Sequence, residues 1–190
     1  MAERPIIFSG DMVKAILADQ KSQTRRVVKP QPKGDVEPCN LPTGFWAIGD
    51  NDYAERCPYG VPGDTLWVRE AWADAGDGKW PEMFEGHLWP KYRATEPDAP
   101  VKRWRPSIHM PRWASRISLR VTGVRVERLN EISPADCIAE GITQPRYGDG
   151  RYCSWVDPYR DLWDSLNGKR APWSSNPLVW CIAFERIGAQ

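Results

Sequence analysis

Six consecutive residues near the start of the chain, Lys21–Arg26 (KSQTRR), bring together a lysine, a threonine and two arginines. They follow an apolar pattern typical of a short amphipathic helix, so they fall where that helix is expected to end. Basic residues at a helix C-terminus complement the helix macrodipole, which explains one or two of these charges. The continuation through Thr24 and Arg26 is not explained in this way. It indicates either a solvated helix end or a site for an anionic or polarised group.

A second cationic segment lies between Ala99 and Val126 and contains no acid. Its seven basic residues are Lys102, Arg103, Arg105, Arg112, Arg116, Arg120 and Arg125. His109 within it is either a proton shuttle or phosphate contact, or a hydrogen-bonded loop histidine. Trp104 and Trp113 stand at the two ends of the stretch around His109, where their rings would either stack on bases or plug one end of the fold. If this segment meets Lys21–Arg26 in space, the two form one positive face.

The composition limits the class of protein. A chain of 190 residues with 41% apolar and 27% charged residues can form one sizeable core. The net charge of +1 supplies no general attraction to nucleic acid, and the eleven tryptophans and eighteen prolines favour a loop-rich fold built on strands. The five cysteines include no closely spaced pair, and no apolar run approaches the length of a membrane span. We expect a cytoplasmic protein with reduced thiols, no signal peptide, no metal and no cofactor.

Hydrophobic periodicity predicts the elements that hold these residues. Strands are expected at residues 5–8, 65–72, 91–94, 117–126 and 178–187, and later helices at 133–140 and 157–167. A first helix, capped by Ser9 or Asp11, is expected to break near Asp19. Its predicted buried face consists of Met12, Ala15, Ile16 and Ala18. Thr122-Gly123 shifts the inward alternation of its strand by one residue, which is typical of a β-bulge.

The order of these elements predicts the fold class and the domain organisation. A strand, a helix, several strands, further helices and a last strand indicate a single small α+β barrel over residues 1–190. Two stretches rich in proline, glycine or tryptophan interrupt this order, at about 30–60 and 74–104. We expect them to be irregular, loop-rich insertions into one domain.

Four motifs occur in the same order as in a known family. They are Lys21–Arg26, the turn and strand Pro62–Val68, the strand Ile117–Leu129 and the helix end Ala139–Ile142. In this order they resemble the ASCH family, a branch of the PUA-like β-barrels associated with RNA and modified nucleosides. The segment Arg105–Trp113 and the tryptophan-rich C-terminal half look like a longer version of the family carried by bacteriophages and prophages. The resemblance implies a PUA-like barrel. The two insertions are a departure from the smaller members of the family, in which these connections are much shorter.

The resemblance also implies an activity, hydrolysis of the acyl amide of N4-acetylcytidine and related nucleosides. Position by position, the family's catalytic lysine, threonine and glutamate match Lys21, Thr24 and Glu140. A threonine hydroxyl attacks an amide when a base takes its proton, and a lysine serves as that base if burial lowers its pKa. Glu140 would hold the ammonium form or assist the leaving amine, and Arg26 would bind a carbonyl or phosphate oxygen. The further residues expected to bind substrate are Arg25, Arg105, His109, Arg112 and Trp113.

Amide hydrolysis by this set requires a particular geometry. Lys21 Nζ should approach the Thr24 hydroxyl within about 3–4 Å, and Glu140 should lie within hydrogen-bond reach of one of the two. Arg26 should point into the same cavity, and the basic segment between Ala99 and Val126 should form part of its rim.

Two other classes of function remain open. One is a non-catalytic RNA- or DNA-binding module of phage origin, which predicts salt-dependent binding without turnover. The other is a ribonuclease that uses Lys21, Arg26 and His109. The expected partner is therefore a modified nucleoside or a nucleic acid, with no membrane involved, and the sequence leaves the oligomeric state open.

Overall fold

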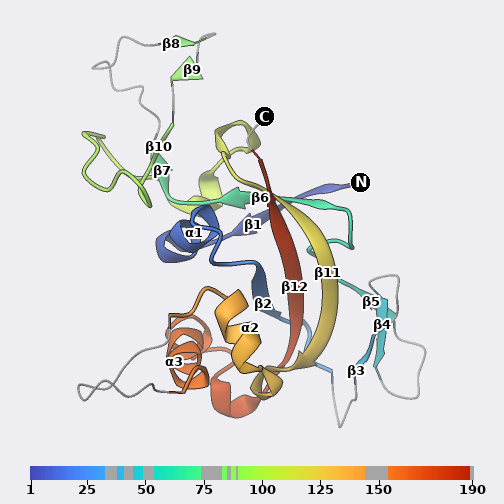
Figure 1. Cartoon of the computed structure of the whole chain (residues 1–190). Helices are drawn as coiled ribbons and strands as arrows, with labels where there is room; N and C mark the ends of the chain where they lie inside the picture. The colour runs from blue at the N-terminus through green and yellow to red at the C-terminus, as the bar shows by residue number, and fades with distance from the viewer. Residues whose placement is uncertain are drawn as a thin grey trace, which may run out of the picture.

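The centre of the fold is a five-stranded sheet with the strand order β1-β6-β11-β12-β2. The computed structural model describes residues 1–32, 38–40, 45–48, 54–73, 83–84, 87–88, 90–143 and 154–188. The strands of the sheet are β1 (Glu3–Ile7), β6 (Thr65–Arg69), β11 (Ser118–Arg128), β12 (Leu178–Ile187) and β2 (Gln23–Val27). β1 pairs with β6 in parallel, and the other three pairs are antiparallel. Figure 1 shows the long, curved strands β11 and β12 running side by side through the middle of the molecule.

A side chain joins the two edge strands of this sheet, β1 and β2. In the described part of the chain no backbone ladder pairs these two strands. Arg26 on β2 instead donates from Nη2 to the carbonyl oxygen of Ile7 at the end of β1, over 2.6 Å. Its guanidinium also lies 5.2 Å from the centre of the Phe8 ring. The predicted α+β class is present, and closure of the sheet into a barrel stays a prediction.

The predicted bulge lies on β11. The register of β11 against β12 shifts between Val121 and Gly123. Ile117, Leu119 and Val121 are buried before the shift, and Val126 is buried after it. The extra residue therefore restores the inward alternation along the strand, as the sequence predicted.

Helix α1 (Gly10–Leu17) begins at the predicted cap, and its buried face matches the predicted one only in part. Ser9 is its N-cap, and the Ser9 hydroxyl accepts the backbone N–H of Met12 over 3.5 Å. The buried residues are Val13 and Ile16, whereas Met12 is half-buried and Ala18 is exposed. The predicted face was wrong at Ala18 because the helix ends one residue before it.

The other two helices start and stop near the predicted positions. α2 (Pro134–Ala139) begins at a capping box in which Ser133 and Asp136 satisfy each other's backbone N–H groups. α3 (Val156–Asn167) buries Tyr159 and Trp163, and the indole N–H of Trp163 donates to the carbonyl oxygen of Ala171 over 2.8 Å. Within the described ranges no helix has the length and apolar character that a membrane span requires.

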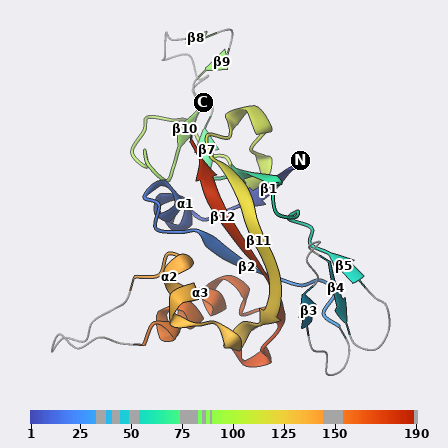
Figure 2. The same cartoon turned by 45° about the vertical axis from the view of Figure 1, so that its right-hand side comes forward.

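β12 is buried on both faces, which explains its nearly unbroken apolar sequence. Its even-numbered residues from Leu178 to Phe184 enter the main core, together with residues of α1. Val179 and Cys181 enter a second cluster with residues of α2 and α3. Figures 1 and 2 both show α2 and α3 on one side of β11 and β12. The two clusters thus share one sheet.

Both predicted insertions contain short strands. β3 (Pro38–Asn40), β4 (Phe45–Ile48) and β5 (Ala54–Arg56) form an antiparallel three-stranded sheet. β7 (Trp72–Ala73) pairs with β10 (Lys91–Tyr92), and β8 (Met83–Phe84) pairs with β9 (His87–Leu88). β7 begins at the end of the strand expected at residues 65–72, and β10 lies within the strand expected at 91–94. For the other five strands the sequence predicted irregular chain, because strands of two to four residues are too short to show a period. The 3₁₀ turns are η1 (Ser107–His109), η2 (Arg112–Ala114), η3 (Leu129–Glu131) and η4 (Trp173–Ser175).

Candidate functional site

A buried ion pair between Lys21 and Glu140 forms the centre of the candidate site. Lys21 Nζ donates to Glu140 Oε2 over 2.7 Å and to the Glu140 carbonyl oxygen over 2.8 Å. The two side chains are only 0% and 4% exposed, although they lie 119 positions apart in the sequence. Lys21 lies two residues before the start of β2, and Glu140 is the C-cap of α2. The predicted contact between these two residues is present.

The backbone conformation at position 141 explains why a glycine follows Glu140 at the end of α2. The φ of Gly141 is +84°, a conformation that favours glycine. A Cβ at this position would also lie 3.1 Å from the Cβ of Ala15 and 3.2 Å from that of Lys21. The backbone of Ser22 is held to the same helix end, since its N–H donates to the carbonyl oxygen of Ala139 over 2.8 Å. A side chain at Gly141 would therefore push Lys21 away from Glu140.

Arg25 binds three carboxylates next to this pair. Its guanidinium contacts Glu140 Oε1 over 3.3 Å, Asp136 Oδ2 over 3.3 Å and Glu127 through both Nε and Nη2. The Arg25 side chain is 0% exposed. The sequence from Gln20 to Gly34 contains no acid, and the fold supplies the acids around Arg25 from β11 and α2. Arg25 therefore orients Glu140, and its predicted role in binding substrate is not favoured by this arrangement.

A partly exposed layer extends the network. Arg125 donates to Glu127 Oε2 over 2.9 Å and to Asp136 Oδ1 over 2.8 Å, and Gln23 donates to the same Asp136 oxygen over 2.9 Å. The sequence analysis missed Glu127, Asp136 and Gln23 as members of the site. Arg125 and Glu127 are two residues apart on one strand and so share a face, which was the one available signal. In the described residues no cluster of carboxylate, histidine and cysteine side chains is arranged to hold a metal ion.

Burial and charge set the protonation properties of this network. Burial lowers the pKa of Lys21, the charge of Glu140 opposes this effect, and the charges of Arg26 and Arg25 reinforce it. Burial would raise the pKa of Asp136, but hydrogen bonds from Ser133 and Gln23 and the charge of Arg25 hold it well below its usual value. The site thus combines a lysine that loses its proton more readily than usual with a carboxylate that stays ionised.

A cavity of about 1120 Å³ adjoins the ion pair, between the end of β1, strand β2 and helix α3. Thr24, Arg25, Arg26 and Glu140 line it, and Lys21 lies behind Glu140. Both recorded hydrogen bonds of Lys21 Nζ go to Glu140, and none in the described part of the chain links it to the Thr24 hydroxyl. The predicted direct Lys21–Thr24 contact is therefore not formed as a hydrogen bond.

Arg26 faces this cavity as predicted, at the seam between the edge strands of the sheet. Its Nε is buried and has no hydrogen-bond partner in the described part of the chain. Burial lowers the pKa of Arg26, although a guanidinium remains protonated at neutral pH. The cavity wall thus includes a cation with unused donors.

The basic segment between Ala99 and Val126 lies mostly elsewhere, which corrects the predicted rim. Of its described residues, Ser107 lines the cavity. The predicted substrate-binding residues Arg105, His109, Arg112 and Trp113 do not.

Contacts to β6 and β7 hold these residues away from the cavity. Arg69 of β6 donates to the carbonyl oxygens of Ile108 and Met110, the latter over 3.1 Å from Nε. The Trp113 ring packs edge-on against Trp72 of β7, with 5.7 Å between the ring centres. The stretch Arg105–Trp113 is therefore tied to the β6 side of the sheet, whereas Arg125, farther along the segment, contacts Gln23 of β2.

Comparisons with known proteins find two similar solved structures at low sequence identity. No family model and no curated protein matches the chain. Protein EF3133 from Enterococcus faecalis V583, described as family-model DUF984, is similar with 10% identity and a TM-score of 0.48 over 100% of this chain and 83% of that one. The ASCH domain from Lactobacillus crispatus JV V101 is similar with 12% identity and a TM-score of 0.42 over 97% and 79% of the two chains. The second carries the name of the family that the motifs resemble. At these TM-scores neither likeness decides the chemistry, so the function is argued from the site itself.

Proposed function

We propose that this protein hydrolyses the amide of an N4-acylated cytosine, as the resemblance to N4-acetylcytidine amidohydrolases implies. The observation that carries the proposal is the buried Lys21–Glu140 ion pair behind a cavity wall that contains Thr24. An ordinary surface lysine is protonated at neutral pH and cannot accept a proton. Lys21 differs because burial lowers its pKa.

The proposed reaction proceeds through an acyl–threonine ester. The neutral Lys21 amine takes the Thr24 proton, directly after a small movement or through one water, while the threonine oxygen bonds to the amide carbon. The C–N bond then breaks, and N4 of cytosine leaves with the proton that Lys21 holds. Water hydrolyses the ester, which releases the carboxylate and restores Thr24. Arg26 donates to the carbonyl oxygen as negative charge develops there.

The test is the incubation of N4-acetylcytidine with the purified protein, followed by chromatography. We expect cytidine and acetate to form at a rate that rises with pH, because Lys21 must lose its proton. The rise should level off below the usual pKa range of lysine, since burial lowers this pKa. An unchanged N4-acetylcytidine peak at enzyme concentrations equal to the substrate would refute the hydrolase.

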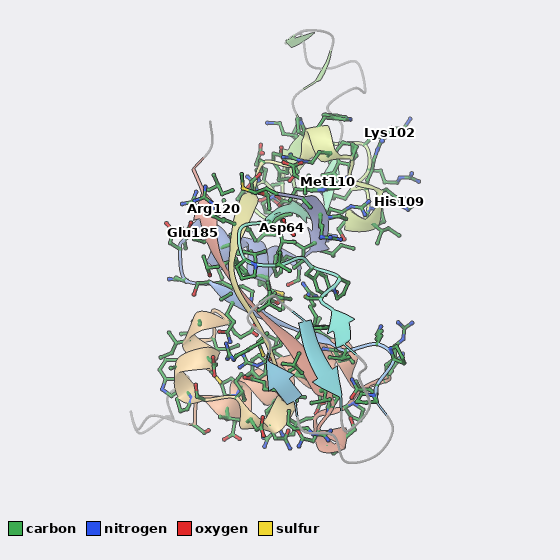
Figure 3. The ribbon with its side chains drawn as sticks, turned by 90° about the vertical axis from the view of Figure 1, so that its right-hand side faces the viewer. Asp64, Lys102, His109, Met110, Arg120 and Glu185 are labelled. Atoms are coloured by element: carbon green, nitrogen blue, oxygen red, sulfur yellow. The ribbon has the colours of Figure 1, made fainter. Side chains whose placement is uncertain are left out.

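Nucleic-acid binding is a second candidate function, favoured by the surface around η1 and η2. Trp113 is 52% exposed and Ile108 is 57% exposed, beside the exposed cations Lys102 and Arg112. Figure 3 shows Lys102 and His109 projecting outward from this part of the molecule. Exposed aromatic rings among cations suit single-stranded nucleic acid, because the bases stack and the phosphates pair with the charges.

Replacing Trp113 with alanine is expected to weaken binding of a labelled single-stranded RNA by about tenfold, because one stacking contact is lost. Fluorescence anisotropy at two salt concentrations measures the affinity and its salt dependence. Ile138→Ala is the matched control, since Ile138 is 50% exposed on α2, on another part of the surface. Equal affinities of the two variants would argue against this surface. Cleavage of the same RNA on a denaturing gel would instead favour the ribonuclease.

A further inference from the structure

The wall of the cavity carries more positive than negative charge. Its basic residues are Arg25, Arg26, Lys29, Lys169 and Arg170, and its acidic residues are Glu140 and Asp164. Arg25 and Glu140 are already paired with each other and with other members of the buried network. Four cations and one carboxylate remain in the described wall. The cavity therefore favours a negatively charged occupant.

Arg26 supplies the buried part of this charge. Its recorded hydrogen bond runs from Nη2 to the Ile7 carbonyl, and its buried Nε has no partner among the described residues. A buried cation without a carboxylate is costly unless other oxygens satisfy its donors. A ligand oxygen in the cavity would satisfy them.

The remaining cations come from two different walls. Lys29 follows β2, whereas Lys169 and Arg170 follow the C-terminus of α3. All three side chains are exposed, and in the described part of the chain they form no ion pair. A helix dipole explains why cations favour the end of α3, but it does not explain Lys29 or Arg26. The convergence on one cavity points to a shared anionic ligand.

We infer that this cavity prefers a nucleotide that carries a phosphate over the corresponding neutral nucleoside. The inference rests on the proposed function for the identity of the base, while the phosphate is argued from the cavity alone. Phosphate oxygens accept paired hydrogen bonds from guanidinium groups and attract lysines. Phe8, Tyr59 and Trp163 line the same cavity and offer apolar surface for the base. A free nucleoside has no charged group that would use Lys29, Lys169 and Arg170, even where Arg26 binds the amide carbonyl.

The first test measures binding without any reaction. Isothermal titration compares three ligands of the protein. Cytidine has no phosphate, cytidine 5′-monophosphate carries a phosphate monoester, and a cytidine-containing RNA trinucleotide carries phosphodiesters. We expect at least one of the two phosphate-bearing ligands to bind about tenfold or more tightly than cytidine. The ligand that gains more affinity identifies whether the phosphate belongs to a mononucleotide or to a strand.

A matched pair of double variants distinguishes the effect of cations in the cavity wall from the effect of the protein's net charge. Lys169→Ala/Arg170→Ala removes two cations of the cavity wall and should abolish most of the preference for phosphate. Lys14→Ala/Arg160→Ala removes the same charge outside the lining and should keep it. Equal binding of cytidine and both phosphate ligands, no binding of any, or a preference that survives loss of Lys169 and Arg170 would overturn the inference. A phosphate preference without hydrolysis of any acetylated substrate would leave the inference standing and remove the proposed hydrolase.

Discussion

Thr24→Val is expected to lower kcat for the hydrolysis of N4-acetylcytidine by about a thousandfold or more, because it removes the proposed nucleophile. Valine keeps the β-branched shape that suits strand β2, where Thr24 is 2% exposed. Among the described residues no hydrogen bond to the Thr24 hydroxyl is found, so its loss leaves no partner unsatisfied. Thermal unfolding should therefore stay close to that of the wild type, and the lost activity can be assigned to chemistry.

Two control variants test whether the lost activity is due to the missing hydroxyl at position 24. Thr24→Ser keeps a hydroxyl at the same position and should retain measurable turnover. Thr122→Val makes the same change at an exposed threonine on β11, away from the cavity, and should leave kcat unaltered. If Thr24→Val hydrolyses the amide as fast as the wild type, water and not Thr24 attacks the carbonyl.

The long periodic elements could be predicted from the sequence because each carries its own signal. β12 spans Leu178–Ile187 as expected, since a strand buried on both faces leaves a continuous apolar run. The slip at Gly123 marked the bulge, and Ser133 marked the start of α2. These signals are local, so no partner strand or helix had to be known to detect them.

The environment of the site could be predicted only in part, because it depends on contacts between distant segments. The Lys21–Glu140 contact was expected from the family resemblance, and it joins residues 119 positions apart. The sequence did not indicate that Glu127 and Asp136 belong to the site. A carboxylate on a strand and a carboxylate that caps a helix are both common in proteins without any functional role. Charge along the sequence also does not show which face a segment occupies. The cations near Trp113 were therefore expected at the cavity, whereas contacts with Arg69 and Trp72 hold them elsewhere.

Arg25→Met is expected to lower the free energy of unfolding by about 3–5 kcal/mol at pH 7, because it removes a fully buried counter-ion that three carboxylates share. The Arg25 side chain is 0% exposed, and it contacts Glu127, Asp136 and Glu140. Methionine fills similar space without charge, so the loss reports on the ion pairs more than on a cavity. Denaturant unfolding followed by circular dichroism measures the difference.

Arg120→Met is the matched control for this change. Arg120 pairs with Glu185 over 3.3 Å, but the two side chains are 54% and 58% exposed, and Figure 3 shows them at the surface. An exposed pair contributes about 0–1 kcal/mol, so this variant should stay near the wild type. A loss for Arg25→Met no larger than that for Arg120→Met would contradict a stabilising role of the network.

The pH dependence gives an independent check on Arg25→Met. Arg25 helps to hold the pKa of Asp136 below its unfolded value, and such a carboxylate stabilises the fold above the unfolded pKa. This stabilisation is lost as the pH falls through the folded-state pKa. The gap between wild type and Arg25→Met should therefore be complete at pH 7 and narrow below about pH 4, where carboxyl groups of the unfolded chain bind protons. A gap that stays constant into acid would mean that Arg25 stabilises the fold through packing and not through its charge.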